Sequence, residues 1–192
     1  MLPKEVLEYG QWPFLTNHTL VFQIITYFLH VLAFFSERFV KARDFVFTAL
    51  AFPLSITVFS FFWGAWFIMG RELIFPKTLD EAIPPWLNHC IHTVILPMNL
   101  ALVSLVAHKF FRRGSAVLMA YSVFYLCILN YVKYKTGFYI YLFLDTFSPI
   151  GLVVFFVFLL AFTYCSYLLG EWMTRRVHGH TAGELVGRAG KK

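Results

Sequence analysis

The chain has 192 residues, of which 59% are hydrophobic and only 14% are charged, and its formal net charge is +6. Soluble domains are about 45–50% apolar and about 25% charged, and a globule of this size cannot hide so much apolar surface. The composition excludes a soluble domain and a disordered chain. The basic residues do not line one element that could fill a nucleic-acid groove, so no nucleic-acid partner is expected. An integral membrane protein remains.

Charge-free stretches predict five membrane-spanning helices. A helix needs about 20 mostly apolar residues to cross the ~30 Å core of a bilayer, and a charge at its centre costs ~2.5–3.5 kcal/mol. We therefore predict an all-α fold, a polytopic transmembrane helical bundle, with a kink at Pro53 in the second span. The predicted spans cover residues 15–35, 45–69, 91–107, 116–132 and 150–169.

One apolar stretch is too short to be assigned to a span. Residues 138–147 are rich in aromatic side chains, but they include Asp145 and lie between Gly137 and Pro149. This length favours an interfacial or re-entrant segment, with a sixth span as the alternative. No repeat or linker divides the chain, so we expect one transmembrane domain over residues 1–170 and a flexible basic tail over 171–192.

The distribution of Lys and Arg predicts the orientation of the chain. With five spans, 11 of the 16 basic residues fall on the side of the C-terminus and 5 on the side of the N-terminus. The positive-inside rule then places the C-terminus in the cytosol. We expect a multi-pass protein, surrounded by membrane lipids, in the endomembrane system or the plasma membrane.

Polar side chains inside the predicted spans are candidates for function, because they are costly in lipid. Interhelical hydrogen bonding is the simplest role for Gln23 and His30, whereas Thr16 stands at the N-terminal end of its span. Four such residues follow spacings of 7, 4 and 3 in the first span and share one helix face: Thr16, Gln23, Tyr27 and His30.

The densest polar cluster, residues 84–93, leads into the third span. Two prolines end any earlier helix, and Asn88 can cap the helix that follows. His89 and His92 are three residues apart and so share a helix face. A solvated histidine pair at the membrane interface is the simplest alternative to a functional site.

Three kinds of chemistry fit these polar residues. A metal or haem site, with His30 as one haem ligand, is disfavoured because the chain has only 7 His and few acidic residues at membrane depth. Cys90 could be a nucleophile, but adjacent helical residues point apart, so His89 is poorly placed to activate it. The third is a hydroxyl nucleophile activated by His. Two crossings separate Thr16 from His92, so both lie on the same face of the membrane.

Several sequence motifs are distributed over roughly residues 12–172. They are ARDF at 42–45, AFP at 51–53, RELIFPK at 71–77, PWLNHCIHT at 85–93, TG at 136–137 and LLGE at 168–171. On these motifs the chain resembles the androgen-induced gene 1 and androgen-dependent TFPI-regulating protein family, also described as FAR-17a-like membrane threonine hydrolases.

The resemblance implies a hydrolase that cleaves fatty acid esters of hydroxy fatty acids. The family's nucleophilic Thr lies in a Trp-x-Phe-Leu-Thr context, which here ends at Thr16, and its catalytic His is the second of Asn-His-x-x-His, here His92. Family members have Gly at the position of Cys90, which argues against a cysteine nucleophile. No cofactor or metal is expected for this chemistry.

Further residues are candidates for supporting roles. Asn88 and His89 could bind the oxyanion at the start of the third span. Arg71 and Lys77 could bind the free carboxylate of the substrate, and Arg71 is favoured because a guanidinium offers two parallel hydrogen bonds. The alternative function is a non-catalytic multi-pass scaffold or regulator, or a transporter, although a transporter usually shows an internal repeat.

Overall fold

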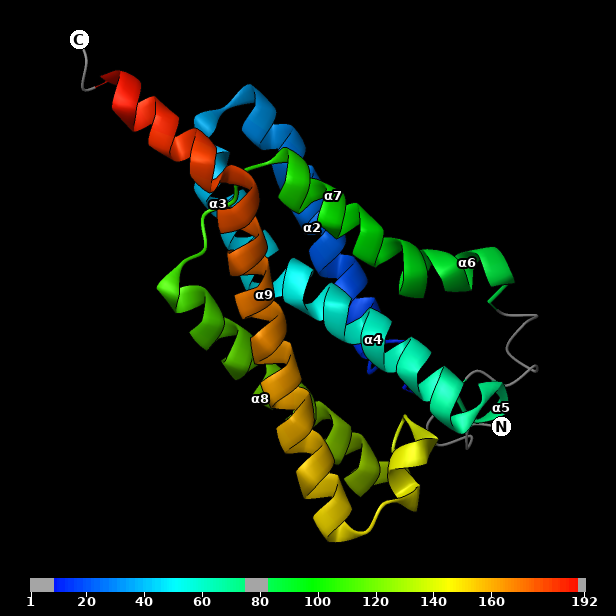
Figure 1. The fold of residues 1–192 in the computed structure, drawn as a ribbon. Helices are drawn as coiled ribbons and strands as arrows, with labels where there is room; N and C mark the ends of the chain where they lie inside the picture. Colours follow the sequence, from blue (N-terminus) through cyan, green and yellow to red (C-terminus); the bar gives the residue numbers. More distant parts are fainter. Residues whose placement is uncertain (1–8, 75–82, 190–192) are drawn as a thin grey trace.

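The computed structural model describes residues 9–74 and 83–189. No strand occurs in this part of the chain. Five helical stretches are long and apolar enough to cross a membrane, and they pack into one bundle (Figure 1). The predicted all-α, five-span transmembrane bundle is confirmed. The spanning stretches are Leu15–Phe35, Glu37–Met69, Pro85–Leu105, Arg113–Thr136 and Pro149–Gly179.

The second and third spans are composite. The first span is α2 (Leu15–Phe35). The second joins η1 (Glu37–Phe39), α3 (Val40–Val46), η2 (Phe47–Ala51) and α4 (Phe52–Met69), and the short α5 (Arg71–Ile74) follows. The third joins α6 (Pro85–His89), η4 (Cys90–Val94) and α7 (Ile95–Leu105). The chain continues through α8 (Arg112–Thr136), η5 (Leu142–Thr146) and α9 (Pro149–Ala189).

The elements η2 and η4 are π-helical turns, and each lies just ahead of a proline, Pro53 or Pro97. A proline has no N–H to donate, and its ring crowds the carbonyl four residues earlier. These carbonyls belong to Ala49 and Thr93, so the wider π turns accommodate the break in the hydrogen-bond ladder. The irregularity expected at Pro53 is thus a π turn, and the equivalent turn in the third span contains His92.

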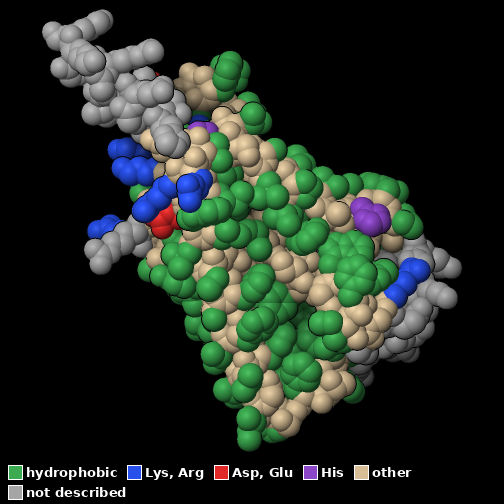
Figure 2. Space-filling model, viewed as in Figure 1, with side chains coloured by type: hydrophobic (Ala, Val, Ile, Leu, Met, Phe, Trp, Pro, Cys, Tyr) green, Lys and Arg blue, Asp and Glu red, His purple; other side chains and the backbone are tan. Residues whose placement is uncertain are grey.

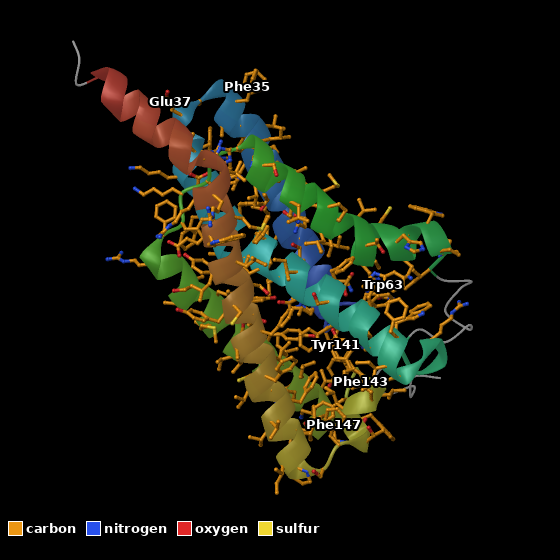
Figure 3. All side chains as sticks on the ribbon, viewed as in Figure 1. Phe35, Glu37, Trp63, Tyr141, Phe143 and Phe147 are labelled. Atoms are coloured by element: carbon orange, nitrogen blue, oxygen red, sulfur yellow. The ribbon has the colours of Figure 1, made fainter. Side chains whose placement is uncertain are left out.

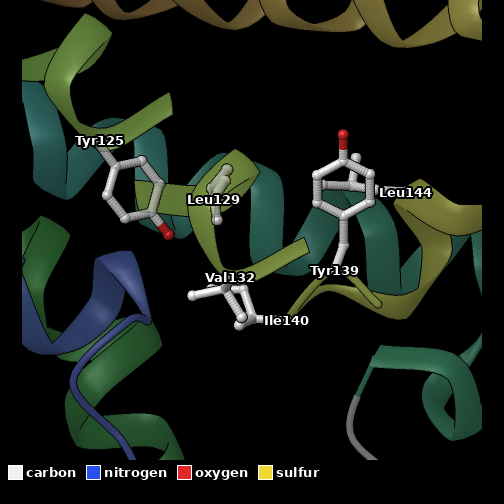
Figure 4. Packing of buried hydrophobic residues seen from close by; sticks show 6 residues of the cluster. All are labelled: Tyr125, Leu129, Val132, Tyr139, Ile140 and Leu144. Carbon is white, nitrogen blue, oxygen red and sulfur yellow. The ribbon is translucent and has the colours of Figure 1, made fainter. Parts of the chain in front are cut away.

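Residues 138–147 fold back onto α8 and do not form a sixth span. Their only helical element is η5, a 3-10 turn. Asp145 holds the fold-back, because its carboxylate accepts from the Lys133 ammonium at 2.5 Å and from the Tyr139 N–H at 3.0 Å. Buried residues of the fold-back and of α8 form one apolar cluster (Figure 4), which comprises Tyr125, Leu129, Val132, Tyr139, Ile140 and Leu144.

A buried ionic cluster ties α3 to the loop after α7. Asp44 is only 3% exposed, and one of its oxygens accepts from the Arg43 guanidinium at 2.9 and 2.8 Å and from His108 Nδ1 at 3.0 Å. The second oxygen accepts from the Lys109 N–H at 3.2 Å. A buried carboxylate needs such compensation, so this cluster sets where the loop enters α8.

The boundary expected at residue 170 is not a helix end. The structure continues α9 to Ala189, and side chains beyond residue 170 still pack on the bundle. Thr174 is buried, and a ring nitrogen of His178 donates to the Val103 carbonyl at 2.8 Å. Glu171 and Arg175 form an ion pair one turn apart at 2.5 Å. These contacts explain why the helix persists beyond the apolar stretch.

The outer surface is that of a membrane protein. Hydrophobic side chains are spread over the whole length of the face seen in Figure 2, and Lys and Arg side chains gather toward the C-terminal part of α9. Large apolar side chains are highly exposed, including Phe34 at 86%, Phe67 at 80% and Ile150 at 78%. Contiguous exposed apolar surface of this kind requires lipid around it, so the chain is an integral multi-pass membrane protein.

Candidate active site

Thr16 and His92 meet at the start of the first span. The Thr16 hydroxyl oxygen lies 3.2 Å from His92 Nε2, although the two residues are 76 positions apart in the chain. Thr16 is the second residue of α2, and His92 lies in the π turn η4. The contact has the length expected between a nucleophile and its general base. The two residues thus share a membrane face, as predicted, and also touch.

His92 is oriented by Asn88 on the opposite edge of its ring. His92 Nδ1 lies 2.9 Å from the Asn88 side-chain oxygen and 3.1 Å from the Asn88 carbonyl. Both acceptors are oxygens, so Nδ1 carries the proton and Nε2 presents a lone pair to the Thr16 hydroxyl. The ring also stacks on Phe62, with centroids 3.7 Å apart. Geometry and tautomer both suit His92 as a base.

Asn88 and His89 do not occupy the positions expected of oxyanion donors. The Asn88 side-chain oxygen faces the Nδ1 edge of His92, whereas Thr16 is at the Nε2 edge. His89 is exposed, pairs with the Thr93 hydroxyl at 3.1 Å and stacks on Trp63. His89 and His92 stack on neighbouring residues of α4, Trp63 and Phe62, so both lie on the side of the third span that faces α4.

Two tyrosine hydroxyls lie beside Thr16, and sequence reasoning did not identify them. The backbone N–H of Leu15 donates to Tyr125 Oη at 3.0 Å and to Tyr141 Oη at 3.1 Å. The two hydroxyls are 3.1 Å apart, and Tyr125 donates to the Pro13 carbonyl at 3.1 Å. They cap the first turn of α2, which has no side-chain N-cap of its own. The aromatic stretch 138–147 was the only signal in the sequence for Tyr141.

Thr16 and His92 open onto an apolar cavity of about 340 Å³. Such a volume is at the lower end of the range for small-molecule sites, ~300–1,000 Å³. Tyr141 and Phe143 lie between α4 and the N-terminal part of α9 (Figure 3). The walls of the cavity come from α4, α8, the fold-back and α9. They include Val58, Phe61, Ala65, Leu129, Phe143 and Phe155.

The described cations lie outside this cavity. Neither Lys nor Arg occurs among its lining residues within 9–74 and 83–189. The Arg71 guanidinium lies 5.7 Å from the centre of the Trp66 ring, and Ile74, one turn further along α5, does line the cavity. Lys77 lies outside the described residues. Over that same part of the chain, no three His, Cys, Asp or Glu side chains are grouped so that they could hold a metal ion.

The sequence matches the FAR-17a/AIG1-like protein family over residues 2–175. The chain belongs to this family. It is 37% identical to the human androgen-dependent TFPI-regulating protein over 180 residues, which are 88% of this chain and 78% of the relative. It is 31% identical to the human androgen-induced gene 1 protein over 188 residues, which are 88% of this chain and 79% of the relative. No solved structure matches the chain.

Membership confirms the resemblance found in the sequence motifs. Thr16, Asn88 and His92 all lie within the matched residues, so the site is built from the part of the chain that the FAR-17a/AIG1-like family shares. The loop between α4 and α6, which carries part of the RELIFPK motif, and the fold-back before α9 are also covered by the match.

Proposed function

We propose that this protein is a membrane-embedded carboxylic ester hydrolase for lipids, with Thr16 as nucleophile and His92 as general base. The observation that carries the proposal is the 3.2 Å contact between the Thr16 hydroxyl and His92 Nε2, with the opposite ring nitrogen held by Asn88. The proposed substrate class, fatty acid esters of hydroxy fatty acids, comes from the family resemblance. The apolar cavity beside Thr16 suits an acyl chain.

The proposed reaction has two halves. His92 Nε2 takes the Thr16 hydroxyl proton while the oxygen attacks the ester carbonyl, and the same nitrogen then returns the proton to the departing alkoxide of the hydroxy fatty acid. In the second half, water attacks the acyl-threonine, with His92 again as base, and releases the fatty acid. Asn88 keeps the proton of the imidazole on Nδ1 in the resting state, so that Nε2 is available.

The membrane setting matches a substrate with long acyl chains. One acyl chain can occupy the cavity of about 340 Å³, while the ester lies at the Thr16 end of α2. The free carboxylate of such an ester needs a cation nearby. Arg71 of α5 and Lys77, three residues after α5 in the sequence, are the proposed partners, because Ile74 at the end of α5 reaches the cavity wall.

The test is an ester-hydrolysis assay on the purified protein in detergent. Wild type is expected to cleave a branched fatty acid ester in preference to triglyceride and phospholipid. His92→Ala should lower kcat by ~10²–10⁴-fold, the usual contribution of a positioned base, and Thr16→Ala should abolish the activity. Thr16→Ser retains a hydroxyl and should remain active.

His89→Ala is the matched control for His92→Ala, because His89 lies on the same span but pairs with Thr93 instead of Thr16. Activity that is equal in wild type, Thr16→Ala and His92→Ala would eliminate this catalytic pair. An inactive wild type would favour the alternative of a non-catalytic scaffold or regulator; the human relative is named a TFPI-regulating protein.

A further inference from the structure

The fold-back before α9 brings the Tyr141 hydroxyl next to the nucleophile. Tyr141 Oη lies 3.1 Å from the N–H of Leu15, the residue immediately before Thr16, and consecutive Cα atoms are ~3.8 Å apart. Tyr141 and Thr16 both line the cavity. The N–H groups in the first turn of α2 have no carbonyl four residues earlier within the helix, so this end of α2 also carries partial positive charge.

The hydrogen-bond pattern directs the Tyr141 proton to another hydroxyl instead of to a carbonyl. Tyr125 has one hydroxyl proton, and it is directed to the Pro13 carbonyl at 3.1 Å. Either hydroxyl could donate in the 3.1 Å contact between them, so with the Tyr125 proton on Pro13 this contact is assigned to the Tyr141 proton. A hydroxyl rotates freely about its C–O bond, so Tyr141 can redirect this proton to a substrate oxygen.

The Tyr141 ring is held in place and stays protonated. It packs edge-on against Phe14, with ring centroids 5.8 Å apart, and the fold-back that carries it is tied to α8 by the Asp145–Lys133 ion pair at 2.5 Å. Burial raises the pKa of Tyr141 above its usual value. The hydroxyl therefore remains a hydrogen-bond donor at neutral pH.

We propose that Tyr141 is a catalytic residue that donates a hydrogen bond to the oxyanion of the tetrahedral intermediate, with Tyr125 as a positioning residue. This inference rests on the proposed hydrolase function. When the Thr16 oxygen bonds to the carbonyl carbon, the π electrons of the carbonyl move to its oxygen, and the Thr16 proton moves to His92. Tyr141 stabilises the resulting oxyanion without giving up its proton. Collapse re-forms the carbonyl, breaks the bond to the alkoxide and returns the proton from His92 to the alkoxide.

The first experiment compares Tyr141→Phe with wild type in steady-state hydrolysis. Loss of one oxyanion donor should lower kcat by ~10²–10³-fold and leave KM nearly unchanged. The thermal midpoint should change little, because Tyr125 still accepts from the Leu15 N–H. Tyr121→Phe is the matched control. Tyr121 lies on α8, pairs with His18 at 2.7 Å and does not line the cavity. The kcat of Tyr121→Phe should therefore equal that of wild type.

The second experiment keeps the hydroxyl and changes its acidity. Replacing Tyr141 by 3,5-difluorotyrosine preserves the ring and its hydrogen bond, but the phenol ionises at lower pH. Activity near neutral pH should be retained, and kcat should fall on the alkaline side because an ionised phenol cannot donate, whereas we expect the wild-type profile to stay flat there. A purely structural role would not produce this new limb.

The outcomes separate the two proposals. An active wild type with an inactive Thr16→Ala variant supports the hydrolase. If Tyr141→Phe then keeps the wild-type kcat, or if the fluorinated protein shows no new alkaline limb, the role of Tyr141 is refuted and the hydrolase stands. A wild type without activity on any ester overturns both.

Discussion

At the scale of single residues, the candidate site depends on which nitrogen of His92 carries the proton. Asn88 presents two oxygens to Nδ1, at 2.9 and 3.1 Å, and neither can donate a hydrogen bond. A neutral imidazole held in this way has its lone pair on Nε2, 3.2 Å from the Thr16 hydroxyl. In the proposed reaction the amide of Asn88 would fix the orientation and tautomer of the imidazole, which is one of the two roles of the carboxylate in a Ser–His–Asp triad.

Asn88→Ala should slow the proposed reaction without abolishing it. The side-chain acceptor is lost, but the Asn88 carbonyl remains 3.1 Å from Nδ1. Misorientation of the base should lower kcat by up to ~10²-fold. Thr93→Val, which removes the partner of His89 on the same span, should leave kcat unchanged. Equal kcat values in wild type and Asn88→Ala would contradict the orienting role.

His108 should make stability depend on pH. Burial, partly opposed by its hydrogen bond to Asp44, lowers the pKa of His108 below its usual 6.5. As the pH falls from about 6.5 towards this lowered pKa, the unfolded chain binds a proton that the folded chain does not, so stability is lost. Glutamine at this position cannot titrate.

The difference in thermal midpoint between wild type and His108→Gln should therefore shrink as the pH falls from about 7.5 to about 5. Thermal unfolding of both proteins in the same detergent measures it, and the remaining titratable groups are common to both. A difference that stays constant or grows over this range would show that His108 is not buried in its neutral form.

At the scale of elements, close contact between α4 and α9 depends on a glycine. A Cβ atom added at Gly170 would lie 2.6 Å from Phe52 Cε1 and 2.9 Å from Phe110 Cζ. Phe52 is fully buried at the start of α4, so it has little room to move. The LLGE motif at 168–171 therefore has a packing role, whereas the π turn η4 carries His92 and the fold-back carries Tyr141.

Gly170→Ala should destabilise the bundle by ~1–3 kcal/mol, the usual cost of overpacking. The comparison is Gly64→Ala in α4, where an added Cβ meets nothing within 4 Å and helix propensity alone predicts a gain of up to ~1 kcal/mol. Thermal midpoints in detergent give both values. The two substitutions should change stability in opposite directions. A Gly170→Ala variant as stable as wild type would show that Phe52 and Phe110 can move aside.

At the scale of the whole molecule, five spans place the two ends of the chain on opposite sides of the membrane. The ionic cluster lies at the end of the bundle where the loop after α7 enters α8, and with five spans the sequence assigns 11 of its 16 Lys and Arg to this side. Thr16 and His92 lie at the other end. The positive-inside rule then places the proposed site on the non-cytosolic side.

A C-terminal reporter should accordingly be digested by protease when only the plasma membrane is permeabilised, and a glycosylation site added at the N-terminus should be modified. Because both signals report on the same orientation, they should change together in any inverted molecule. A protected C-terminal reporter with an unmodified N-terminal site would reverse the orientation and place Thr16 on the cytosolic side.

The amino-acid sequence by itself determined the spans and the shared membrane face of Thr16 and His92. Both follow from local properties, because lipid penalises charge wherever it occurs and an even number of crossings returns the chain to the same side. The tertiary structure decided what meets His92. Thr16 contacts His92 from 76 positions away, and Tyr141 reaches Leu15 from 126 positions away. Such contacts depend on how helices pack, and no periodicity in the chain encodes them.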